Sequence, residues 1–216
     1  MIAPAAGVTG AGAELSMKKI VLATHNSGKL AELQMLLAPL DCQLVLQSDL
    51  GIAAADEPFH TFVENALVKA RHASEHSGLP ALADDAGLCV DAFGGEPGVQ
   101  TAYYATRFGY AKSDANNVRA LLEQMRGVTQ RRAALVSTLV AVRNPHDPEP
   151  LIAVGRAVGQ IAEAPRGQHG FGFDPVLYVP ELGHTFAELD PSVKNMHSHR
   201  GKAARAMVAL MRERWW

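Results

Sequence analysis

Two long runs of β-forming residues set the strongest limit on how this chain can fold. Residues 133–142 read AALVSTLVAV and residues 151–161 read LIAVGRAVGQI, with a proline-rich turn at residues 144–150 between them. Two such runs joined by a short turn predict long antiparallel neighbours in a β-sheet. Their length favours a ribbon that projects from the core sheet, and such a projection often carries a subunit contact.

A polar turn near the start of the chain lies between an expected strand and an expected helix. The apolar residues 20–23 predict a strand buried on both faces, and residues 44–46 predict a second strand. Between them, leucines recur at helical spacing until Pro39. The turn THNSGK at residues 24–29 therefore has the strand–turn–helix geometry that aims backbone N–H groups at phosphate.

Lys29 at the end of this turn adds positive charge to the same place. The turn is not a Walker A loop, because the upstream glycine and the Ser or Thr after the lysine are both missing. The alternative is an ordinary helix start with Ser27 as its cap.

A second helix is expected from Thr61 to the glycine at position 78. Thr61 and Glu64 form a capping box, which gives Glu64 a structural role in preference to metal binding. Val63, Leu67 and Ala70 form the inward stripe. Lys69 has two readings, a solvated helical lysine or a lysine beside a metal–phosphate site, because the helix starts just after Asp56 and Glu57.

The acidic pair Asp84 and Asp85 is the strongest indication of a functional site. The pair emerges from an apolar run and leads towards the glycine-rich stretch FGGEPG at residues 93–98. Adjacent carboxylates repel each other, and a divalent ion such as Mg²⁺ or Mn²⁺ explains why they occur together. A carboxylate left free beside the metal can take a proton from bound water. The alternative is an acidic surface turn, but an acidic turn that ends in a flexible loop favours a site.

The second half of the chain supplies aromatic and basic residues. Residues 101–107 are aromatic and are expected to form a loop, and residues 113–126 are expected to form a helix. In the glycine-rich loop 167–175, Phe171 is expected to stack on a base, whereas Phe173 is expected to enter the core. In residues 194–200, Ser198 is expected to cap the last helix. The side chains of Lys194, His197, His199 and Arg200 bring hydrogen-bond donors to the start of that helix.

Composition excludes several classes of protein. The chain has 216 residues, 48% of them hydrophobic, a net charge of −2 and two cysteines, which suits one domain in a reducing cytoplasm with neither a disulfide framework nor a zinc site. No broad basic face is expected, so nucleic acid and anionic membranes are not expected as partners. Residues 1–16 are expected to be a disordered extension, and residues 17–216 a single domain.

Five short motifs together resemble one enzyme family. They are THNSGK at residues 24–29, FVENA at 62–66, ADDAGL at 83–88, GFGFDP at 170–175 and SHR at 198–200. In their order and spacing the chain resembles the inosine triphosphate pyrophosphatase family over about residues 17–214. These enzymes hydrolyse deaminated purine nucleoside triphosphates such as ITP, dITP and XTP to the monophosphate and pyrophosphate, which cleanses the nucleotide pool.

The resemblance implies an α/β fold with a long mixed central sheet flanked by helices and two lobes with a nucleotide cleft between them. It also implies Mg²⁺ dependence, with Mn²⁺ as a substitute, and a homodimer. Asp85 would be the catalytic proton acceptor, and it would hold the metal together with Asp56 or Glu57. The adjacent Asp84 and the metal are expected to keep Asp85 competent to accept that proton.

The resemblance further implies substrate contacts. The triphosphate contacts would come from Thr24, Asn26, Lys29 and Lys69. The base contacts would come from Phe171, Asp174, Lys194, His199 and Arg200. Further substrate-binding residues would be His25, Ser27, Gly28, Ala86, Gly172 and Phe173. Ala86 stands where many relatives carry a serine, so a hydroxyl contact to the nucleotide is missing, and Phe173 replaces a frequent tyrosine.

Two other functions remain open at this point. One is a nucleotide-binding sensor without turnover, against which the carboxylates argue because they would face an anionic ligand. The other is a pyrophosphatase for modified pyrimidine nucleotides.

Overall fold

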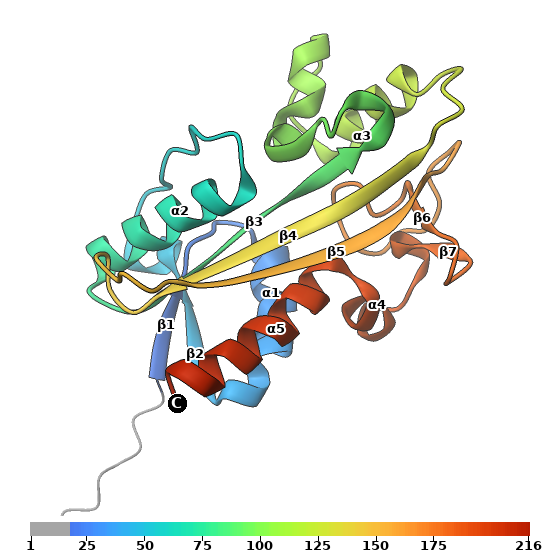
Figure 1. The fold of residues 1–216 in the computed structure, drawn as a ribbon. Coiled ribbons are helices and arrows are strands. Elements are labelled where there is room, and N and C mark those ends of the chain that lie inside the picture. Colours follow the sequence, from blue (N-terminus) through green and yellow to red (C-terminus); the bar gives the residue numbers. More distant parts are fainter. Residues whose placement is uncertain (1–17) are drawn as a thin grey trace, which may run out of the picture.

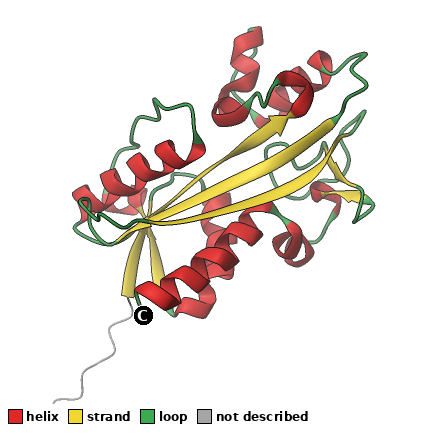
Figure 2. Cartoon of the chain, in the orientation of Figure 1, coloured by secondary structure: helices red, strands yellow, loops and turns green. Residues whose placement is uncertain are grey.

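The computed structural model describes residues 18–216, and the expected extension 1–16 and the start at Met17 lie outside the described residues. One seven-stranded sheet in the order β2-β1-β3-β4-β5-β6-β7 runs through the molecule, with helices on both of its faces (Figures 1 and 2). Its strands are β1 (Lys18–Leu22), β2 (Cys42–Leu46), β3 (Ala81–Val90), β4 (Arg132–Val142), β5 (Leu151–Ile161), β6 (Leu177–Val179) and β7 (His184–Thr185).

The sheet is mixed, as the sequence analysis expects. Strand β1 runs parallel to both β2 and β3, and the pairs from β3 to β7 are antiparallel. The expected strands at 20–23 and 44–46 are confirmed as β1 and β2. The two long runs are confirmed as the antiparallel neighbours β4 and β5.

The prediction that these two strands form a projecting ribbon is wrong. Strand β4 lies at the centre of the sheet, because it pairs along its length with β3 on one side and with β5 on the other. Residues 133–142 are buried throughout, and a strand that is apolar on both faces is stable only between neighbours and beneath covering helices. Strand β5 alternates between buried and exposed residues, so one of its faces is open.

Within the described residues, five α-helices flank the sheet. They are α1 (Ser27–Leu37), α2 (Phe62–Ser77), α3 (Asp114–Gln124), α4 (Pro191–His197) and α5 (His199–Arg214). Figure 1 shows α2 on one side of the long strands, α1 and α5 on the other, and α3 near the far end of β3. The 3₁₀ segments are η1 (Ala38–Leu40), η2 (Gln47–Leu50), η3 (Asp91–Phe93), η4 (Gly98–Phe108) and η5 (Phe186–Glu188).

Two local predictions need correction. The cap of α1 is Asn26 and not Ser27, because the Asn26 side-chain oxygen accepts the backbone N–H of Lys29 at 3.1 Å. The aromatic segment 101–107 is part of η4 and not a loop. The Thr101 hydroxyl, which donates to the Gly98 carbonyl, helps to close the first turn of that helix.

The caps of two other helices are confirmed. Thr61 begins α2 by accepting the N–H of Glu64 at 3.3 Å, and its hydroxyl donates to the Glu64 carboxylate. The glycine at position 78 ends this helix with φ of +67°. Ser198 begins α5 by accepting the N–H of Gly201 at 3.0 Å. These caps fix where α2 and α5 start, and both helices carry residues of the site described next.

The buried side chains form three clusters around the sheet. One cluster joins η4 and α3 to the far ends of β3, β4 and β5, a second lies between the sheet and helices α1 and α5, and a third lies under α2. Phe173 is confirmed as a core residue, with 2% of its surface exposed. Within residues 18–216, none of the helices is both long and apolar enough to cross a membrane.

Candidate active site

Asp84 and Asp85 lie in the middle of β3, so the prediction of an acidic turn is wrong. Successive side chains of a strand point to opposite faces of the sheet, and the two carboxylates therefore do not face each other. Each is buried and each has its own basic partners. Charge pairing within the fold keeps the two anions in one continuous strand.

The Asp84 carboxylate lies on the face covered by α1 and α5. It accepts the Ser137 hydroxyl at 2.6 Å and the Nε and Nη2 groups of Arg200 at 3.0 and 2.8 Å. Lys29 Nζ lies 3.1 Å from the same carboxylate. Burial disfavours the charged form, but Arg200 and Lys29 hold the pKa of Asp84 well below its usual range. Asp84 is therefore the internal counter-ion of two cations.

The Asp85 carboxylate lies on the opposite face, below α2. Its Oδ1 atom is 2.7 Å from Lys69 Nζ, and its Oδ2 atom is buried without a hydrogen-bond partner among the described residues. Burial raises the pKa of Asp85 to about 6 despite the charge of Lys69, and neighbouring Glu57 adds to the increase. The pKa of Asp85 is thus raised by burial and by Glu57, and not by Asp84 as expected.

Lys69 holds the acidic groups of this face together. Its Nζ lies 2.9 Å from Glu57 Oε2 and 3.2 Å from the Asp84 carbonyl oxygen. Burial opposes ionisation of both Glu57 and Lys69. The charge of Lys69 and hydrogen bonds with Lys69 and Asp85 nevertheless lower the pKa of Glu57, and the charges of Asp85 and Glu57 raise the pKa of Lys69. Lys69 is therefore not the solvated helical lysine that the sequence left open.

The donor set on this face fits a Mg²⁺ ion that is shared with a substrate. Within residues 18–216, no cluster of three or more His, Cys, Asp or Glu side chains is placed to hold a metal ion alone. The partnerless Oδ2 of Asp85 lies in a group with the Glu57 carboxylate, and Asp56 lines the same cavity. Mg²⁺ is commonly bound through one or two carboxylates plus substrate phosphates, which matches such an incomplete site.

Two cavities adjoin at this point of the sheet. The first, of about 480 Å³, contains Asp56, Glu57, Lys69 and Asp85 among its lining residues. The second, of about 160 Å³, is lined among others by Asn26, Phe171, Gly172, Phe173, Asp174, Lys194, His199 and Arg200. Lys29, Ala86 and Ala102 line both. The acidic cavity with its lysines is thus next to an aromatic and basic one.

The second cavity has an aromatic wall with cations held against it. Lys194 Nζ lies 5.0 Å and Arg200 Cζ 5.4 Å from the centre of the Phe171 ring. The glycine at position 28 also approaches this ring, since a Cβ there would lie 3.3 Å from it. Phe171 is only partly buried, and its stacking on a base stays a prediction.

Asp174 binds two hydrogen-bond donors of the second cavity. Lys194 Nζ lies 2.7 Å from Asp174 Oδ2, which also accepts the backbone N–H of Phe171 at 2.9 Å. Burial raises the pKa of Asp174, although Lys194 acts against this shift. Burial, reinforced by the charge of Arg200, lowers the pKa of His199 well below its usual value, so this imidazole is neutral at pH 7.

Some residues of the predicted site lie apart from these cavities. The ring of His25 is hydrogen-bonded to Gln47, the Thr24 hydroxyl accepts the N–H of Asn26, and Ser27 is exposed. None of these three side chains lines either cavity. His197 is exposed, unlike its neighbour His199.

The structure also adds residues that the sequence analysis missed. Glu32 pairs with Lys194 Nζ at 2.7 Å and with Arg200 Nη1 at 2.6 Å. Its position three residues after Lys29 on the same helix is a signal that could have found it. Two further residues carry no such local signal, because their partners are distant in sequence. Ser137 donates to Asp84, and Asp114 accepts the N–H of Gly172 at 2.7 Å.

Fold and site together define an α/β protein in which a cavity lined by lysines and carboxylates adjoins an aromatic one. The particular family follows from sequence. The chain belongs to the Ham1 family, whose model matches residues 20–210.

Named relatives and solved structures agree with this assignment. The chain is 75% identical over 198 residues to a dITP/XTP pyrophosphatase of Paracidovorax citrulli (strain AAC00-1), covering 92% of this chain and 100% of that protein. It is 76% identical over 197 residues to the dITP/XTP pyrophosphatase of Albidiferax ferrireducens (strain ATCC BAA-621 / DSM 15236 / T118), covering 91% and 99%. The structure of a HAM1 protein from Coxiella burnetii has a TM-score of 0.84 at 43% identity, covering 91% and 100%. The Staphylococcus aureus Ham1 protein has a TM-score of 0.80 at 34% identity, covering 91% and 99%. The expected α/β class is thereby confirmed.

Proposed function

We propose that this protein hydrolyses deaminated purine nucleoside triphosphates, such as ITP, dITP and XTP, to the monophosphate and pyrophosphate. The names of its relatives support this activity. The observation that carries the proposal is the junction of the two cavities at Lys29 and Ala86. A nucleotide that spans this junction has its base beside Phe171 and its phosphates beside Lys29, Lys69 and Asp85.

The phosphate end is served by cations and by the first turn of α1. Lys29 and Lys69 offset the negative charge of the triphosphate, and the N-terminus of α1 adds its own positive dipole end. Glu57 and Asp85 are the residues that would hold Mg²⁺, with Asp56 as the alternative to Glu57 and Mn²⁺ as a substitute ion. A bound ion there supplies charge neutralisation and polarises the phosphate.

Asp85 is the proton acceptor in this proposal. Its Oδ2 atom has no hydrogen-bond partner within residues 18–216, and burial raises its pKa to about 6, so a proton from an attacking water has a suitable destination. Attack of that water at the α-phosphorus breaks the bond to the β-phosphate. Pyrophosphate leaves as a unit because the cations grip the β- and γ-phosphates.

The base end favours a purine with an oxygen at C6. Phe171 offers a stacking face, and Lys194, His199 and Arg200 supply donors beside it. A donor aimed at the C6 oxygen of inosine or xanthosine would meet the amino group of adenine, which leaves two buried donors unpaired. Ala86 offers no hydroxyl at the junction.

We further propose that the protein is a two-lobed homodimer that acts in the cytoplasm without nucleic acid or membrane partners. The open face of β5 supports a dimer, because Ile152, Val154 and Val158 are exposed there by 44%, 59% and 42%. The core cluster at η4 and α3 is separate from the cluster under α2 and from the cluster between the sheet and helices α1 and α5. This separation supports two lobes.

A panel of nucleoside triphosphates with separate detection of pyrophosphate and orthophosphate tests the function. We expect pyrophosphate from ITP, dITP and XTP and much slower release from ATP and modified pyrimidine nucleotides. Initial release of orthophosphate would contradict cleavage at the α–β bond. Tight binding without any product would favour a sensor.

A further inference from the structure

Two residues that line neither cavity are connected to Arg200 indirectly, one through Asp84 and one through the first turn of α5. These residues are Ser137 of β4 and Gly155 of β5, which pair in register with each other, while Ser137 also pairs with Ala86 of β3. Paired residues share a face of the sheet, so all three lie on the face covered by α5. Ala86 lines the cleft, and Ser137 and Gly155 lie behind it.

Ser137 controls the orientation of the Asp84 carboxylate. Its hydroxyl donates to Oδ1 at 2.6 Å, and this leaves Oδ2 to accept both N–H groups of Arg200. Ser137 has 0% of its surface exposed and Asp84 has 1%, so water is not at hand to replace the hydroxyl. Without this donor, Arg200 and Lys29 are left to orient the Asp84 carboxylate, and its Oδ1 atom is no longer fixed. Arg200 then depends more on its second partner, Glu32, and is less precisely oriented.

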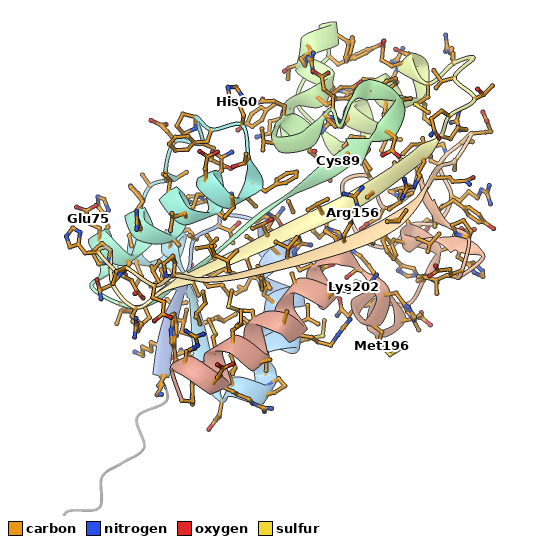
Figure 3. All side chains as sticks on the ribbon, viewed as in Figure 1. His60, Glu75, Cys89, Arg156, Met196 and Lys202 are labelled. Carbon is orange, nitrogen blue, oxygen red and sulfur yellow. The ribbon has the colours of Figure 1, made fainter. Side chains whose placement is uncertain are left out.

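Gly155 lets the backbone of α5 pack directly against β5, and this contact is called the seat of α5. A Cβ at this position would lie 2.0 Å from the His199 carbonyl oxygen and 2.5 Å from the Ala203 backbone nitrogen. The first turn of α5 therefore rests directly on the backbone of β5, and Lys202 Nζ reinforces the contact by donating to the Arg156 carbonyl at 3.0 Å. Figure 3 labels Lys202 on α5 and Arg156 on β5. Any side chain at position 155 must push this turn, and Arg200 with it, away from the sheet.

We propose that Ser137 and Gly155 are positioning residues for base selection, which act on Arg200 through Asp84 and through the seat of α5. This inference rests on the proposed function, in which Arg200 faces the base. Asp84 also pairs with Lys29, so the same carboxylate links the base pocket to the phosphate cavity. Neither positioning residue touches the nucleotide.

The first test removes the Ser137 hydroxyl. We expect Ser137→Ala to lower kcat/KM for ITP about tenfold, the effect of one hydrogen bond to a charged group, and to narrow the ratio of ITP to ATP turnover. The matched control is Ser74→Ala, because Ser74 is equally buried and donates to the Leu79 carbonyl at 2.7 Å, away from the cleft. The control is expected to lose stability without changing the ratio.

A binding measurement gives a readout independent of turnover. Calorimetry with IMP and AMP in the absence of metal is expected to show that Ser137→Ala weakens IMP binding about tenfold and leaves AMP binding nearly unchanged. Equal losses for both nucleotides would contradict a role in base selection.

The second test adds one methyl group on β5. Gly155→Ala is expected to narrow the ratio of ITP turnover to ATP turnover. Gly159→Ala is the control. Its Cβ would also meet backbone, 2.3 Å from the Tyr178 carbonyl oxygen, but this backbone belongs to β6 and not to α5. If Gly155→Ala does not fold, Ser137→Ala decides the outcome. A wild-type protein that releases no pyrophosphate from ITP would overturn the proposed function. An active wild type whose variants match their controls would overturn this inference alone.

Discussion

The carboxylates of Asp84 and Asp85 lie on opposite faces of one strand, and each is bonded to a different set of cations. Asp84 pairs with Arg200 and Lys29 next to the aromatic pocket, and Asp85 pairs with Lys69 in the acidic cavity. Adjacent positions in the chain thus serve two separate tasks. Only Asp85 retains a free buried oxygen among the described residues, which makes it the candidate for chemistry.

Replacing Asp85 with Asn should reduce kcat by about 10²–10⁴-fold, because the change removes a proton acceptor and a metal charge while it preserves the shape of the side chain. Pyrophosphate release at saturating Mg²⁺ measures the loss, and urea unfolding checks that the fold survives. Glu64→Gln is the control, since Glu64 contacts Thr61 at the start of α2. Near wild-type turnover of Asp85→Asn, or an inactive but stable Glu64→Gln, would contradict these roles.

Replacing Phe171 with Ala should lower kcat/KM for ITP about 10–100-fold, since stacking of a base on an aromatic ring is worth ~1–3 kcal/mol. Phe171→Tyr keeps the ring and should retain most of the activity. Phe108→Ala is the matched control, because this phenylalanine is 39% exposed and lies outside both cavities. Equal activity of the Ala and Tyr variants at position 171 would show that the ring does not contact the base.

Acidification should destabilise the protein in part through His199. Its folded-state pKa lies well below the unfolded value of ~6.5, because of burial and the charges of Arg200, Lys194 and Lys29, which outweigh that of Asp84. Below that value the unfolded chain binds more protons than the folded one, so the free energy of unfolding decreases as pH falls.

The test compares urea unfolding of the wild type and of His199→Gln at pH 7.5 and pH 5.5. The free energy of unfolding of the wild type should fall further over this interval than that of the variant. Parallel losses in the two proteins would mean that His199 is protonated in the folded state.

A charge on the open face of β5 should separate the proposed dimer. Val154→Asp places a carboxylate between Ile152 and Arg156 on the open face of β5, where an interface would desolvate it. Light scattering at micromolar concentration should give twice the monomer mass for the wild type and the monomer mass for the variant. Met35→Asp, on the 56% exposed side chain of α1, should remain a dimer. A monomeric wild type would refute the dimer itself.

The sequence by itself determined the elements whose cause is local. The caps at Thr61 and Ser198, the stop at the glycine in position 78 and the two long strands follow from residues within a turn or a strand of each other. The strand–turn–helix at residues 18–37 has the same origin, although its cap is Asn26. The motifs also identified the family, because their order along the chain needs no structure.

Only the tertiary structure decided where the acidic pair lies and what each carboxylate does. A strand continues through Asp84 and Asp85 because cations from distant parts of the chain are brought to them: Lys29 from α1, Lys69 from α2 and Arg200 from α5. The burial that raises the pKa of Asp85 likewise comes from packing below α2.

Strand register likewise belongs to the tertiary structure alone. The pairing of Ser137 with Gly155 places a hydroxyl under Asp84 and a bare backbone under α5, and neither residue stands out in the sequence. Register results from many weak contacts summed along three strands and two helices, and a shift of one residue would move every one of these side chains to the other face. No local pattern in the chain encodes that sum.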